Sequence, residues 1–180
     1  MKKVKTFSLA ITMLISFLSL GQEINGKNKF KEYEFFMLNK EYENYDDVIK
    51  SNGFKKVSDT SFTLSNSDYR LTQIRKKSKI LILFSKINLN YETDEANESL
   101  TLLDTLQINS LDDNNFVTIG YCELDGLIPE QIISLVKKSK KEYLEMIIKS
   151  WKVNEKTMRI EKIVDVSKIK CINEHFEYSE

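Results

Sequence analysis

The side chains best suited to covalent chemistry are two cysteines, Cys122 and Cys171, and the single histidine, His175. A histidine beside a cysteine can activate a thiolate nucleophile, and His175 follows Cys171 by four residues. Two cysteines in an oxidising compartment, however, usually pair with each other. We therefore predict a Cys122–Cys171 disulfide. By reducing the conformational entropy of the unfolded chain, it would raise the free energy of unfolding by about 4 kcal/mol. The Cys171–His175 pair is kept as the alternative.

A run of basic side chains, Lys137-Lys138-Ser139-Lys140-Lys141, could hold a phosphate group or an anionic polymer. Glu142 and Glu145 follow Lys138 and Lys141 by four residues, a spacing that forms ion pairs on a helix. We favour this second interpretation, in which the run is a solvated helix face.

Two groups of acidic side chains could also mark a site. The segment Asp112-Asp113-Asn114-Asn115 offers the oxygen ligands that calcium prefers, but it lacks the glycine and distal glutamate of an EF-hand, so we predict a loop. Asp104 lies within the apolar stretch 102–106, and a buried acid often marks a functional site. Strand alternation instead predicts that Asp104 points outward, opposite to Leu103.

No motif for catalysis or cofactor binding stands out in the sequence. It contains no G-x-S-x-G elbow for a serine nucleophile, and its five glycines are not grouped as they are in phosphate-binding loops. We therefore predict no catalytic residue, no cofactor and no metal ligand. Any two of the 27 acidic residues could still meet in a cleft, so a small carboxylate-dependent hydrolase is kept as an alternative function.

The first 21 residues have the pattern of a secretory signal peptide. Three lysines precede an uncharged apolar run, residues 7–20, which is shorter than the roughly 20 residues of a transmembrane helix. Small residues at Ser19 and Gly21 suit signal peptidase, so we predict cleavage between Gly21 and Gln22. An uncleaved membrane anchor is the alternative.

Export changes what the composition implies. Loss of the three signal lysines leaves 24 of the 27 basic residues against 27 acidic residues, a net charge of −3. This balance argues against a nucleic-acid partner, which would need a basic surface. Because the first cysteine is Cys122, no lipid can be attached at the cleavage site. We expect a secreted or periplasmic protein with no membrane anchor after cleavage.

Short elements follow the signal peptide. The polar residues 22–29 are predicted to be flexible. Asn44 can cap a short helix whose first turn carries Asp46 and Asp47, and Asn52-Gly53 can end that helix. Alternating apolar residues then predict strands. The expected strands lie around Phe62 and Leu64, and over residues 69–75, 79–91, 100–108, 116–124, 157–166 and 168–173.

One long helix is expected over residues 129–151, because Pro129 suits a first turn and apolar residues recur at spacings of four and seven. These residues are Ile132, Val136, Tyr143, Ile147 and Trp151. We therefore predict an α+β fold in which a mostly antiparallel sheet is packed by this helix and by the shorter N-terminal one. Residues 30–180 are expected to form a single domain.

The function expected from these features is that of a non-enzymatic binding or interaction module. It would be an exported soluble protein of the bacterial cell envelope, and its partner would be a protein or an envelope component. Aromatic residues often dominate the energetics of interfaces, and several lie near the start of the predicted domain. The candidate contact residues are Tyr33, Phe35, Phe36, Tyr42 and Tyr45.

Overall fold

The computed structural model of the chain describes residues 36–90, 97–109, 112–127, 129 and 131–176. The chain divides into two compact units, Met1–Glu34 and Phe35–Glu180, and all described residues belong to the second. The predicted signal peptide, the cleavage site at Gly21 and Gln22, and the flexible segment 22–29 lie outside the described residues.

Sheet A contains five antiparallel strands in the order β1-β5-β4-β3-β2. Its central strand β4 is apolar on both faces because both faces are covered. Phe84 faces the neighbouring sheet, whereas Leu83 shares the opposite face with Ser85, which contacts the helix. The bounds are β1 (Glu41–Tyr42), β2 (Lys55–Leu64), β3 (Ser67–Lys76), β4 (Lys79–Asn90) and β5 (Asn97–Ile108).

Two further antiparallel sheets follow in the chain. Sheet B has four strands in the order β11-β10-β8-β6, and sheet C has three short strands in the order β7-β12-β9. Gly120, at a φ of +81°, separates β6 from β7 and so allows the chain to leave one sheet for the other. The bounds are β6 (Asn115–Ile119), β7 (Cys122–Leu124), β8 (Ile132–Lys137), β9 (Tyr143–Leu144), β10 (Ile147–Asn154), β11 (Arg159–Ile163) and β12 (Ile169–Ile172).

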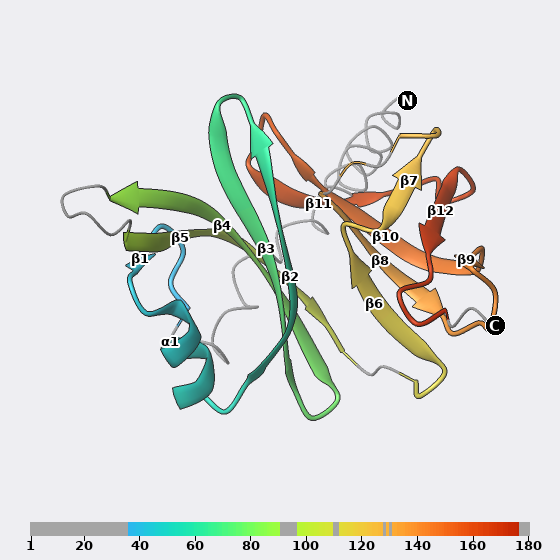
Figure 1. The fold of residues 1–180 in the computed structure, drawn as a ribbon, viewed down its shortest axis with the longest axis horizontal. Helices are drawn as coiled ribbons and strands as arrows, with labels where there is room; N and C mark the ends of the chain where they lie inside the picture. The colour runs from blue at the N-terminus through green and yellow to red at the C-terminus, as the bar shows by residue number, and fades with distance from the viewer. Residues whose placement is uncertain (1–35, 91–96, 110–111, 128, 130, 177–180) are drawn as a thin grey trace, which may run out of the picture. The chain divides into compact units, whose positions relative to one another are not determined.

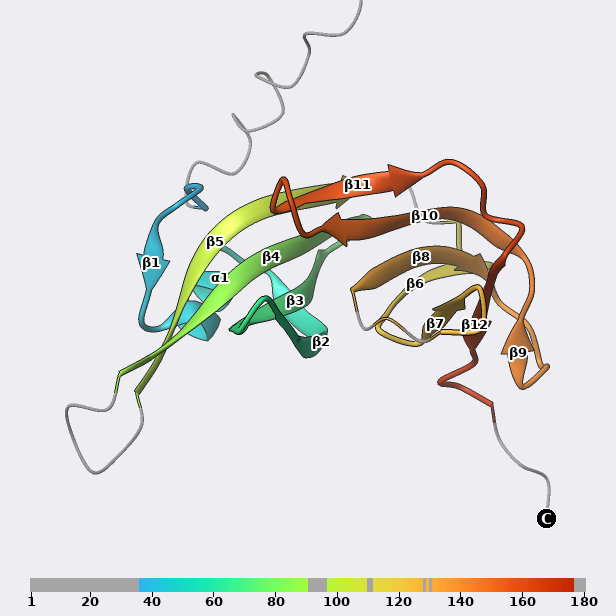
Figure 2. The same cartoon turned by 90° about the horizontal axis from the view of Figure 1, so that it is seen from above.

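The described residues form layered antiparallel sheets (Figure 1), and apolar cores lie on both faces of sheet B. Sheets A and B bury the first core between them, and β11 of sheet B lies beside β5 of sheet A (Figure 2). Sheet C covers the other face of sheet B and buries a second core that contains both cysteines. Sheet B therefore has apolar residues on both faces, which is the reason its strands do not show a simple polar alternation.

The short helix α1 (Tyr45–Ser51) covers the other face of sheet A. Asn44 is its N-cap residue, as predicted, although its side chain makes no capping hydrogen bond. Asp46 and Asp47 lie in the first turn, and Gly53 follows the helix at a φ of +73°. The sequence prediction of this helix is confirmed.

The predicted long helix over residues 129–151 is wrong. The described part of this segment forms β8, β9 and the start of β10. A spacing of four residues fits a strand as well as a helix, because four is also a multiple of two. Ile132 and Val136 therefore share the β8 face toward sheet C, and Ile133 and Leu135 share the face toward sheet A.

The predicted α+β class is wrong for the same reason. Among the described residues the fold is β-rich, with three antiparallel sheets and one short helix. The antiparallel arrangement itself and most of the predicted strands are confirmed, including the hairpin of β2 and β3, whose turn is formed by Ser65 and Asn66. The predicted strand over 116–124 is two strands, because Gly120 interrupts it.

Candidate functional site

The two cysteines lie directly opposite each other on neighbouring strands of sheet C. Cys122 of β7 and Cys171 of β12 are paired in register, their sulfurs are 2.10 Å apart, and both side chains are fully buried. The structure thus places the cysteines as the expected disulfide requires. Because neither thiol is free, Cys171 cannot serve His175 as a nucleophile. The ring of His175 instead packs edge-on against Phe116.

The register of the cysteines determines which side chains point outward from sheet C. Side chains alternate along a strand, so the neighbours of each buried cysteine face away from the core. Ile172 pairs with Tyr143 of β9 on one side, and its amide donates to the carbonyl of Tyr121 (2.8 Å) on the other. Tyr121, Ile172 and Tyr143, which we call the apolar row, are 46%, 40% and 37% exposed.

A lysine completes this outer face. The Nζ atom of Lys170 lies 3.7 Å from the centre of the Tyr143 ring, the distance of a close cation–π contact. Lys170 also lies opposite Glu123 in the pairing of β12 with β7. The outer face of sheet C is therefore an aromatic and aliphatic surface that is bordered by charge.

The basic run lies beside the apolar row, in the connection between β8 and β9. Lys137 is the last residue of β8, and we call residues 138–142 the lysine loop. Asn173, which follows Ile172 and is 5% exposed, donates its side-chain amide to the carbonyls of Ser139 (3.0 Å) and Lys141 (2.8 Å). The amide of Asn173 donates to the carbonyl of Glu142 (2.8 Å). One buried asparagine thus fastens the loop to the end of β12.

The prediction that this run is a helix face is wrong, because Lys137 ends strand β8 and residues 138–141 lie in a loop. Lys141 does pair with Glu145 (3.1 Å), so one of the two expected ion pairs is formed. The ammonium groups of Lys137, Lys138 and Lys140 have no carboxylate partner in the part of the chain that the structure describes, and all three residues are exposed. The loop therefore presents more positive charge than the helical interpretation implied.

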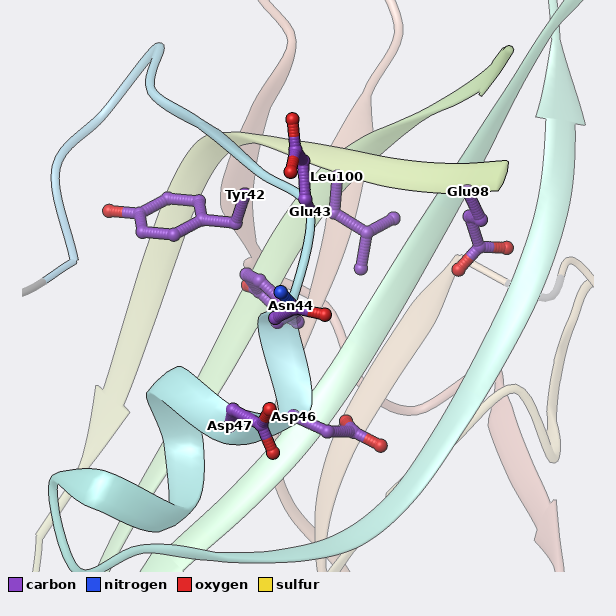
Figure 3. Close-up of a pocket in the computed structure, with 8 residues that line it drawn as sticks. Tyr42, Glu43, Asn44, Asp46, Asp47, Glu98 and Leu100 are labelled. Atoms are coloured by element: carbon purple, nitrogen blue, oxygen red, sulfur yellow. The ribbon is translucent and has the colours of Figure 1, made fainter. Parts of the chain in front are cut away.

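An acidic groove lies beside sheet A, where β1 leads into α1 (Figure 3). Two adjoining hollows of about 270 and 380 Å³ share Glu43, Asn44 and Glu98 in their linings. Figure 3 shows the carboxylates around the turn between β1 and α1, with Glu98 across from them on β5. The other acidic residues that line the hollows are Glu41, Asp46 and Asp47.

Several carboxylates of the groove already have partners within the chain. Glu98 accepts two hydrogen bonds from the guanidinium of Arg70, one of them at 2.8 Å. Glu41 accepts from Asn88 (3.2 Å) and from Ser99. These contacts link β1, β3, β4 and β5, so the carboxylates that make them support the fold of sheet A.

The aromatic residues predicted as contacts belong to the core where the structure describes them. Phe36, Tyr42 and Tyr45 are at most 6% exposed, and their rings lie 5.7–6.1 Å from one another. Tyr33 and Phe35 lie outside the described residues. The interface candidates that the sequence prediction missed are Tyr121, Tyr143 and Ile172. The pairing of the two cysteines is the signal that could have revealed them, since it determines which neighbours point outward.

Asp104 does not point outward as alternation predicted. A β-bulge at Leu103 shifts the register, so that Asp104 lies opposite Phe84. Its carboxylate accepts a hydrogen bond from the amide of Ile160 in β11 (2.7 Å). Asp104 therefore links the edges of sheets A and B, and this contact accounts for an acid in an apolar stretch.

Asp112, Asp113 and Asn114 lie in a loop, as predicted, and Asn115 is the first residue of β6. The amide of Asn115 donates to the carbonyl of Asp112 (2.9 Å). In the described ranges, no three histidine, cysteine or acidic side chains converge as a metal site would require. The same ranges contain no helix of the length and apolarity needed to cross a membrane.

Comparisons with known proteins add no relative. No protein-family model matches the sequence, and neither the curated proteins nor the solved structures contain a match.

Proposed function

We propose that this protein is an exported, non-enzymatic binding module of the bacterial cell envelope, which holds a partner protein on the outer face of sheet C. The export pattern of the first 21 residues supports the location, and a buried disulfide suits an oxidising compartment. The observation that carries the proposal is the apolar row, because its three side chains are exposed and adjacent: Ile172 and Tyr143 pair on β12 and β9, and Tyr121 directly precedes β7.

Exposed apolar residues are informative when they are contiguous. Single exposed apolar side chains occur on every soluble protein and need no explanation, whereas contiguous ones mark interaction surfaces. Val57 and Val164 are examples of the first kind, 53% and 92% exposed on other strands and loops. Tyrosine and aliphatic side chains at the centre of a patch, with charges around them, have the anatomy of a protein interface.

The hydrolase alternative depends on the acidic groove and has less support. A glycosidase-type mechanism needs one carboxylic acid and one carboxylate on opposite sides of the substrate. Glu41 and Glu98 face the groove, but each is engaged in hydrogen bonds that hold strands together. Catalysis would need the same carboxylate oxygen atoms that now accept hydrogen bonds between strands, so we favour a binding function over a catalytic one.

The proposal is tested by comparing proteins captured from envelope extract of the producing cells. The immobilised wild type is compared with Tyr121→Ser/Ile172→Ser and with a control, Val57→Ser/Val164→Ser, which removes apolar groups that are more exposed and lie elsewhere. We expect a discrete protein that the wild type and the control retain and that the sheet C variant loses. Equal capture by all three proteins would exclude the outer face of sheet C as the binding surface.

A further inference from the structure

We infer that the partner presents an acidic segment of polypeptide that also carries apolar side chains, and that the lysine loop holds its carboxylates. This inference rests on the proposed function, because it assigns a chemistry to the partner that the outer face of sheet C would bind. It follows from the position, the anchoring and the charge of the lysine loop, and from the apolar row beside it.

The lysine loop and the apolar row form one continuous surface. Tyr143 follows the loop directly in the chain, and Asn173, which anchors the loop, follows Ile172. The far side of the loop is also held, because the amide of Lys138 donates to the carbonyl of Asn114 (2.8 Å). A partner that covers Ile172 and Tyr143 would therefore come within reach of the lysine ammonium groups.

The anchoring matters energetically. A flexible loop loses conformational freedom when a partner orders it, and this loss weakens binding. Here the backbone is already held by the buried side chain of Asn173 and by the amide of Lys141, which donates to the hydroxyl of Ser139 (3.1 Å). Only the lysine side chains remain to be ordered by the partner.

Charge complementarity identifies the partner as anionic at this position. Lys138 and Lys140 are exposed and have no carboxylate partner among the residues described. Since the mature chain as a whole is predicted to carry a net charge of −3, this local excess of positive charge is opposite in sign to the average surface. Such a patch attracts negative groups and raises the rate at which they associate.

The apolar row decides which anionic partner fits. A phosphate polymer or a free anion would satisfy the lysines but would leave Tyr121, Ile172 and Tyr143 exposed to water. An acidic polypeptide that also carries leucine or phenylalanine side chains would satisfy both halves of the surface. Burying even one such side chain favours binding by about tenfold. We therefore assign an acidic protein segment rather than a phosphate polymer.

The inference is tested by titrating the purified exported protein with three probes of equal charge. These are a synthetic peptide that alternates Asp and Glu with Leu and Phe, poly-glutamate, and inorganic polyphosphate. We expect the peptide to bind about tenfold more tightly than either polyanion. The variant Lys138→Gln/Lys140→Gln should bind the peptide about fivefold more weakly than the wild type does. The matched control Lys50→Gln/Lys77→Gln, which neutralises two exposed lysines near sheet A, should bind as the wild type does.

Four results would overturn the inference. They are no binding of the peptide, polyanions that bind as tightly as the peptide, unchanged peptide binding by Lys138→Gln/Lys140→Gln, and self-association of the protein that this variant abolishes. The last result would mean that a second copy occupies the lysine loop, through a surface such as its own acidic groove. It is detected by analytical ultracentrifugation at low and high salt.

The capture experiment separates this inference from the proposed function. If Lys138→Gln/Lys140→Gln still retains the envelope protein that Tyr121→Ser/Ile172→Ser loses, the apolar row binds a partner that is not held by the lysines. The proposed function then stands and the acidic partner is excluded. If both variants retain that protein, the proposed function itself fails.

Discussion

The hydroxyl of Tyr45 is one of the few polar groups buried against sheet A. It lies 3.2 Å from the hydroxyl of Ser85, which is fully buried in β4, and together they satisfy each other's hydrogen bonding away from water. Burial disfavours the charged phenolate, and it raises the pKa of Tyr45 far above its ordinary value of 10. The hydrogen bond with Ser85 opposes this rise but does not cancel it.

The raised pKa of Tyr45 predicts how stability depends on alkaline pH. The unfolded chain releases this proton near pH 10, whereas the folded protein retains it. The free energy of unfolding should therefore be unaffected below pH 10 and should fall above it, by up to about 1.4 kcal/mol per pH unit. Urea unfolding from pH 9 to pH 11 measures this slope. Tyr45→Phe should show a shallower slope, and equal slopes would refute the assignment.

The hydrogen bond of Asp104 leads to a second prediction, which concerns the stability of the fold. In Asp104→Ala the amide of Ile160 loses its acceptor, and we expect the free energy of unfolding to fall by about 1–2 kcal/mol. Asp104→Asn keeps an acceptor oxygen and should lose less than half as much. Urea unfolding gives the stabilities, and hydrogen exchange at Ile160 reports the local opening. Slow exchange at that amide in Asp104→Ala would show that the contact does not link the two sheets.

At the scale of the elements, sheet C depends on its disulfide. Its three strands are two to four residues long, too short to be stable by backbone pairing alone. Cys122→Ala/Cys171→Ala should lower the free energy of unfolding by about 2–4 kcal/mol. Hydrogen exchange should accelerate first in β7, β9 and β12, while β3 and β4 stay protected. Uniform acceleration over all sheets would contradict this local role.

The helix and strands also show which elements local sequence patterns can predict. The short helix could be predicted because Asn44, the first-turn acids and Gly53 are local signals that need no tertiary context. The sequence of β8 and β10 predicts a helix because sheet B is covered on both faces, so the alternation typical of a strand is hidden within nearly continuous apolar residues. A spacing of four between Ile132 and Val136 then allowed both interpretations.

The candidate site was predictable only in part. The pairing of Cys122 and Cys171 is predictable from the count of two cysteines in a chain that is expected to be exported. The lysine run is visible in the sequence, but the predicted helix pairs its lysines with glutamates and so hides its free positive charge. The same predicted helix includes Tyr143. Its position beside Ile172 depends on the register of β9 and β12, a long-range property that local patterns do not contain.

At the scale of the whole molecule, the proposed function assumes export. The exported protein should begin at Gln22, so its intact mass should correspond to residues 22–180 less two hydrogens for the disulfide. Mass spectrometry of the protein recovered from the envelope fraction or medium measures this directly, and labelling of free thiols should give no signal while the protein is folded. Recovery of the full-length chain in the cytoplasm with two labelled cysteines would contradict export.

The central claim is that a partner protein lies on the outer face of sheet C. The most direct test places a photo-crosslinking amino acid at Ile172 in the cells that produce the protein, with Val164 as the exposed control position. We predict a crosslinked adduct of one discrete mass from position 172 and none of that mass from position 164. No adduct from position 172, or the same adduct from both positions, would contradict the claim.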